Sequence, residues 1–164
     1  MLKKVLLFIA IFLPFSVSAA SLHLGDYFLK GSEQVSDDLY SVGRTTTIAG
    51  VVTGDAIAVG RDIFSQGDIS ADALFVGEGV RIEGEVGDDV RILGGVVLID
   101  GTVKGDLIVI GAQVTVDSKA RIEGSLYVVG GEVIIRGTVL GDSKVLSNDL
   151  LLTGVVEGDL ELWG

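Results

Sequence analysis

Aspartate is the residue whose spacing in this chain could support chemistry. It follows glycine or another corner residue at a near-constant interval, in a column that comprises Asp55, Asp72, Asp89, Asp106, Asp142 and Asp159. If each interval is one turn of a coil, the carboxylates stack about 5 Å apart and could bind calcium. The chain lacks the nine-residue G-G-x-G-x-D repeat of calcium-binding coils, and aspartate at corners commonly accepts bonds from backbone N–H groups. We therefore favour a structural corner over a calcium site.

No other group of residues suggests catalysis. His23 is the only histidine and there is no cysteine, which excludes histidine-pair and thiolate metal sites as well as disulfides. The 23 acidic and 12 basic residues give a net charge of -11, which disfavours nucleic acid as a partner. We expect a protein that is not an enzyme and that uses no metal and no cofactor.

The first twenty residues differ in kind from the rest. The segment "MLKKVLLFIAIFLPFSVSAA" places Lys3 and Lys4 before an apolar run and ends in small residues. This order is typical of a secretory signal. We predict that residues 1–20 are a signal peptide and that the protein is exported to the periplasm, the cell envelope or the extracellular space. The alternative is an uncleaved segment that holds the protein at a membrane through residues 5–17.

A repeat of 17 residues must position the aspartates. The anchor residues lie 17 apart, with a single interval of 19 before the sixth, and they are Asp38, Asp55, Asp72, Asp89, Asp106, Ser125, Asp142 and Asp159. Apolar residues keep their own columns relative to the anchors, as Val97 and Ile99 do, and glycines keep others. The two additional residues fall within residues 116–124, where we expect a bulged corner.

This repeat predicts the fold. Alternating β-branched residues mark strands, and glycines every five to seven residues are expected to mark corners with unusual φ angles. Each unit then holds three short strands and three bends, and it must stack on its neighbours in parallel register to bury its apolar side chains. We predict an all-β, single-stranded parallel β-helix (β-solenoid) with three faces. Residues 38–164 form about eight turns in a rod roughly 40 Å long, and residues 21–37 form a capping segment or an imperfect first turn.

The repeat also resembles a known family. The units "EGEVGDDVRILGGVVLIDGTVKGDLIVIG" (residues 83–111) and "GGEVIIRGTVLGD" (residues 130–142) are similar to the bactofilins, bacterial polymer-forming cytoskeletal proteins. The resemblance covers about residues 37–164 and rests on the recurring pattern G-x-V-x-G-D-ϕ-x-ϕ-x-G. It implies a right-handed parallel β-helix that assembles end to end, without nucleotide, into non-polar filaments that serve as scaffolds near the membrane. Bactofilins are usually cytoplasmic, so the signal-like segment indicates an exported relative.

The function predicted from the repeat and the resemblance is that of a self-assembling structural scaffold whose main partner is a second copy of itself. Membrane or cell-envelope components are further candidate partners. Leu160, Leu162 and Trp163 in "GDLELWG" are the expected polymerisation end, because no polar cap follows them and another molecule could add its own turn there. Two alternatives stay open: further turns or a cap follow downstream, or the protein is an exported, monomeric binding or adhesin module.

Overall fold

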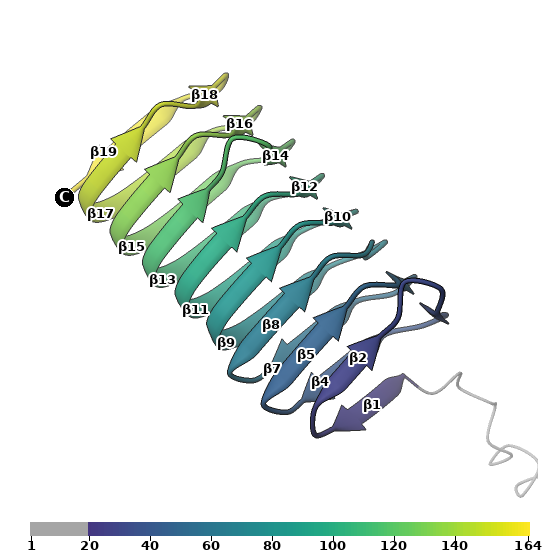
Figure 1. Ribbon diagram of the computed structural model, residues 1–164. Coiled ribbons are helices and arrows are strands. Elements are labelled where there is room, and N and C mark those ends of the chain that lie inside the picture. Colours follow the sequence, from purple (N-terminus) through teal and green to yellow (C-terminus); the bar gives the residue numbers. More distant parts are fainter. Residues whose placement is uncertain (1–19) are drawn as a thin grey trace, which may run out of the picture.

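The computed structural model describes residues 20–164, which form a rod of stacked parallel strands without a helix (Figure 1). The chain winds through about eight turns, and aligned residues in successive turns are mostly 17 apart. The predicted β-solenoid is therefore confirmed. The predicted signal peptide, residues 1–20, lies outside the described residues apart from Ala20. Residues 20–164 hold no helix of the length and apolar character needed to cross a bilayer.

Each turn contributes to three faces. The separate strands of the first face are β1 (Ser21–Leu24), β4 (Leu39–Val42), β7 (Ala56–Val59) and β19 (Leu160–Trp163). Those of the second face are β2 (Tyr27–Leu29), β5 (Thr45–Ile48) and β8 (Asp62–Ser65). Strands that run through both of these faces are β9 (Ala73–Ile82), β11 (Val90–Ile99), β13 (Leu107–Val116), β15 (Leu126–Ile135) and β17 (Ser143–Leu152). The third face consists of the short strands β3 (Gln34–Val35), β6 (Val51–Val52), β10 (Glu85–Val86), β12 (Thr102–Val103), β14 (Arg121–Ile122), β16 (Thr138–Val139) and β18 (Val155–Val156).

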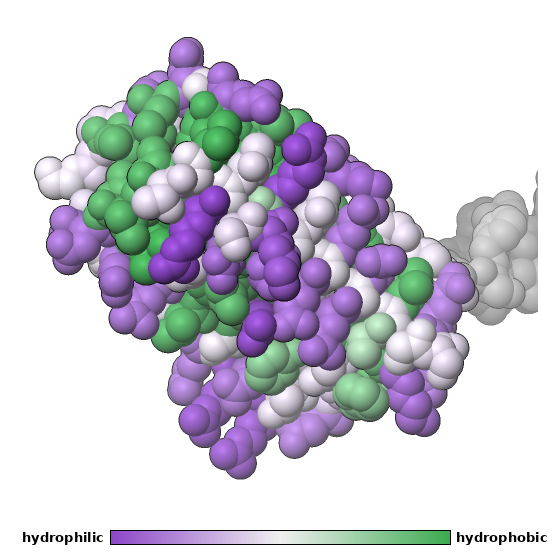
Figure 2. All heavy atoms as spheres, turned by 45° about the horizontal axis from the view of Figure 1, so that its top comes forward, coloured by the Kyte–Doolittle hydropathy of each residue, from purple (hydrophilic) through white to green (hydrophobic). Residues whose placement is uncertain are grey.

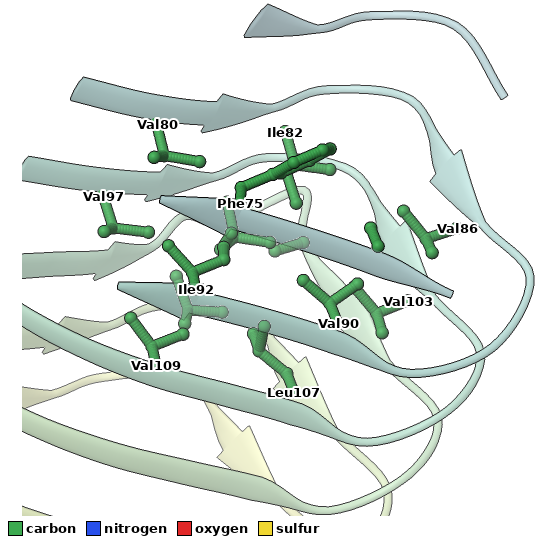
Figure 3. Close-up of a cluster of buried hydrophobic side chains, with 14 of the residues drawn as sticks. Phe75, Val80, Ile82, Val86, Val90, Ile92, Val97, Val103, Leu107 and Val109 are labelled. Atoms are coloured by element: carbon green, nitrogen blue, oxygen red, sulfur yellow. The ribbon is translucent and has the colours of Figure 1, made fainter. Parts of the chain in front are cut away.

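Five inward columns fill the interior of the rod. In the turn that starts at Asp89 the inward residues are Val90, Ile92, Val97, Ile99 and Val103, and none is more than 4% exposed. Figure 3 shows the side chains of such columns pointing into the space between the faces. The parallel register places each inward residue beside its equivalent in the next turn, so a fixed interval along the sequence is what keeps the core apolar.

The glycines have a different role from the one predicted. Among the described residues, Gly25 is the only one with a positive φ, 103°. The expectation of unusual φ angles throughout the glycine columns is therefore wrong. A Cβ atom built on Gly84 would instead overlap the carbonyl oxygen of Gly67, and one built on Gly101 would overlap that of Gly84. Glycine is required at this corner because successive turns approach too closely for a side chain.

The corner between the first two faces also differs from the expected bend. Strands β9, β11, β13, β15 and β17 each continue through this corner as ten residues, so these turns hold one long and one short strand rather than three short ones. The pairing of Gly94 with Gly111 shows that the register is kept at the corner itself. The bulged corner expected in residues 116–124 is present, since the N–H of Ala120 donates to the carbonyl of Asp117 at 2.9 Å in a turn between β13 and β14.

Candidate assembly site at the C-terminal turn

The aspartate column holds one corner of the solenoid together. The Oδ1 atom of Asp38 accepts a hydrogen bond from the backbone N–H of Asp55 at 2.9 Å, and Asp89 accepts one from Asp106 at 2.9 Å. Ser125 continues the series, because its N–H donates to Asp106 at 2.7 Å. Each carboxylate thus satisfies a backbone group of the following turn at the corner between the third face and the first.

In two of these aspartates the other carboxylate oxygen, Oδ2, also has a partner. Within residues 20–164, the one group of acidic side chains close enough to share a cation is formed by Asp72, Asp88 and Asp89, whose ligand oxygens lie within 4.8 Å of one another. Arg91 already lies in this group: its Nη1 is 3.3 Å from Asp72 Oδ2 and its Nη2 is 2.9 Å from Asp89 Oδ2. Both oxygens of Asp72 and of Asp89 therefore have partners in the protein, and the column is a structural feature of the corner.

The residues predicted as the polymerisation end lie on β19, which pairs along one edge with β17. Leu160 is aligned with Ser143 and Leu162 with Val145, so both leucines continue inward columns of the core. Trp163 is aligned with Leu146 and faces outward from the first face. No strand within residues 20–164 pairs with the opposite edge of β19. The structure thus separates the three residues into two core positions and one lateral position.

Within residues 20–164, core positions are exposed at the C-terminal end of the rod. Leu160 is 40% and Leu162 is 51% exposed, whereas Val145, one turn before Leu162, is 1% exposed. Sequence reasoning missed three residues that complete the open surface: Leu150, Leu152 and Val156 occupy inward columns and are only partly buried against the core. Their membership in the repeat columns was the signal that could have identified them. Figure 2 shows apolar side chains gathered at this end, away from the grey segment.

The opposite end of the rod has a different chemistry. The inward positions of the first face in β1 are occupied by Ser21 and His23, whose Oγ and Nε2 atoms lie 2.8 Å apart. The ring of His23 stacks on that of Tyr27 with centroids 3.8 Å apart. Burial, and to a lesser extent the charge of Glu33, raises the pKa of the Tyr27 hydroxyl. This end presents polar and aromatic groups at positions where the C-terminal end presents leucine.

The open end has the features of a surface for strand addition. It combines unpaired backbone groups along β19 with apolar core positions that a further turn would cover. A regular β-solenoid of this kind is consistent with a repeat scaffold. The chain matches no protein-family model, no curated protein and no solved structure.

Proposed function

We propose that this protein is a self-assembling structural scaffold that polymerises end to end through the ends of its β-helix, the C-terminal turn among them, without nucleotide, in the manner that its resemblance to the bactofilins implies. The observation that carries the proposal is the exposure of Leu160 and Leu162 in columns that are buried one turn earlier. A second molecule that adds a turn there would continue both the core and the hydrogen-bond ladder. The assembly would need no cofactor and no enzymatic activity.

The energetics favour such a contact. Full burial of a leucine side chain stabilises by about 1.5–3 kcal/mol, so completing the burial of the two half-exposed leucines contributes about 1 kcal/mol each. Leu150, Leu152 and Val156 add further apolar area, and each restored backbone hydrogen bond adds about 0.5–1.5 kcal/mol. Together these terms are large enough to offset part of the entropy that two associating molecules lose.

The predicted export remains part of the proposal. With the signal peptide assigned to residues 1–20, the scaffold acts in the periplasm, the cell envelope or outside the cell, with membrane or envelope components as additional partners. Membrane attachment through residues 5–17 is the alternative location. Nucleic acid is disfavoured as a partner because the net charge is -11.

Negative-stain electron microscopy of the purified protein at low micromolar concentration tests the proposal. We expect filaments from the unchanged protein and short rods from Leu162→Asp, because the new carboxylate would be buried without a partner in the joint. Trp163→Asp tests the third predicted residue. Leu151→Asp is the matched control, since Leu151 is 49% exposed but lies outward on the second face. Isolated rods in every sample would contradict end-to-end assembly and favour the monomeric binding or adhesin module.

A further inference from the structure

Exposed apolar side chains are concentrated on the outward side of the first face. Of the 18 large apolar residues exposed within the described part of the chain, 11 lie in the two outward columns of this face, against four on the second face and one on the third. The column next to the glycine corner is apolar in every turn and includes Val42, Val59, Leu93, Ile110, Val129 and Leu146, which are 42–53% exposed. We call the outward side of β1, β4, β7, β19 and the first four residues of each long strand the lateral apolar face.

From this face we infer a second interface: two copies of the chain pack side by side through their lateral apolar faces, related by a two-fold axis. The stack of nine strand layers, from β1 to β19, is about 40 Å long, and a four-residue strand is about 13 Å wide. The face therefore measures about 500 Å² in projection, so a pair covers about 1,000 Å². That is close to the smallest area of a specific protein interface, and the face is as large as the largest apolar patch on a typical monomer.

The near-neutral charge of the lateral apolar face is compatible with a second copy as the binding partner. The charged residues in the two outward columns are Arg91, Lys144 and Glu161. Arg91 is paired with Asp72 and Asp89 at the corner, and Lys144 Nζ lies 3.4 Å from Glu161 Oε1. The face is thus close to electrically neutral in a chain whose net charge is -11. Two such faces can be desolvated without leaving an unpaired charge, and the repulsion between the acidic remainders of the two rods is screened by salt.

The other two faces do not offer the same surface. The outward columns of the second face include Asp62, Glu132 and Asp149, which would be brought against acidic residues of another copy. The third face presents the ion pair of Lys104 with Glu85 and other polar residues. Lateral contact between identical rods is therefore expected on the first face, and it does not require the end-to-end joint proposed above.

Sedimentation velocity of the purified Leu162→Asp protein between about 1 and 100 μM tests the inference, because this variant disrupts the joint at the C-terminal turn but leaves the lateral apolar face unchanged. We expect twice the monomer mass at the upper concentrations. We also expect tighter pairing when NaCl is raised from 50 to 500 mM, since salt screens the repulsion between two acidic rods. Adding Leu93→Glu with Ile110→Glu, which lie side by side in β11 and β13, should raise the dissociation constant at least 100-fold.

The matched control is Leu162→Asp with Val96→Glu and Leu151→Glu. These two positions are 55% and 49% exposed on the second face, against 53% and 50% for Leu93 and Ile110. The control should pair as Leu162→Asp does. A monomer at 100 μM, or equal loss of pairing in the control and the face variant, would overturn the inference. Binding of the Leu162→Asp protein to phosphatidylcholine vesicles that Leu93→Glu/Ile110→Glu abolishes would also overturn it, by identifying a lipid surface as the occupant. If the unchanged protein forms no filaments but the Leu162→Asp protein still pairs, only the end-to-end proposal is contradicted.

Discussion

The backbone N–H of Asp106 donates a 2.9 Å hydrogen bond to the carboxylate of Asp89 in the preceding turn. The same bond recurs along the column, from Asp55 to Asp38 at one end and from Asp159 to Asp142 at the other. The aspartates are therefore acceptors that hold the corner of each turn to the corner of the next. This role explains why aspartate recurs at the interval of the turn.

Replacing Asp89 with alanine should lower the free energy of unfolding by about 1–3 kcal/mol, because the substitution leaves the Asp106 N–H without its charged acceptor. Asp89→Asn keeps an acceptor oxygen and should cost less than half as much. Urea-induced unfolding, followed by circular dichroism, measures both. Asp88→Ala is the control, since Asp88 is exposed and its side chain makes no hydrogen bond within residues 20–164. Equal losses for Asp88→Ala and Asp89→Ala would contradict the corner role.

Replacing either of two inward serines with alanine should change thermal stability, but in opposite directions. The hydroxyl of Ser65 is buried without a hydrogen-bond partner in the described structure, between Ile48 and Ile82 of the adjacent turns. The hydroxyl of Ser41 lies 2.7 Å from that of Thr46 in the same core. Ser65→Ala should raise the midpoint of thermal unfolding, whereas Ser41→Ala should lower it because Thr46 loses its buried partner, at a cost of about 1–3 kcal/mol. A fall in the midpoint for both variants would show that Ser65 has a partner in solution.

These serines also mark the limit of what the sequence predicts. The recurring interval was enough to predict the solenoid, because residues such as Val97 and Val114 return after one turn and stack in register. The inward position of Leu160 followed from the same columns, whereas that of Leu162 is shown by its pairing with Val145 in the structure. The reason for the glycines did not, since the approach of Gly84 to the Gly67 carbonyl depends on the path of the backbone in three dimensions. The apolar column that ends at Trp163 is visible in the sequence. Only the structure shows that its side chains are exposed together on one face.

Alanine at Gly84 should destabilise the solenoid by about 1–3 kcal/mol, because its Cβ would overlap the carbonyl oxygen of Gly67 and force two turns apart. Gly31→Ala is the matched control. A Cβ at Gly31 would lie 3.6 Å from its nearest neighbour, the carbonyl oxygen of Ala49, which is an ordinary contact. Thermal unfolding of the two variants under identical conditions provides the comparison. Similar midpoints would mean that the corner can open without cost and that glycine is not required there.

An aspartate in an inward column should be far more costly than one on the third face. Val97 is 1% and Ile99 is 0% exposed, so Val97→Asp or Ile99→Asp would bury a carboxylate without a partner and cost several kcal/mol. Thr102 and Lys104 follow on the third face, where Thr102 is half-buried and Lys104 is exposed, and the same substitution should be mild. In the unchanged protein the hydrogen bond and charge of Glu85 raise the pKa of Lys104. Lys104→Asp removes this ion pair, but an exposed pair contributes little to stability. The midpoints of urea unfolding for the four variants test the assignment. Because neighbouring turns share one core, the inward variants should also unfold less cooperatively. Equal midpoints at all four positions would contradict the assignment of the inward columns.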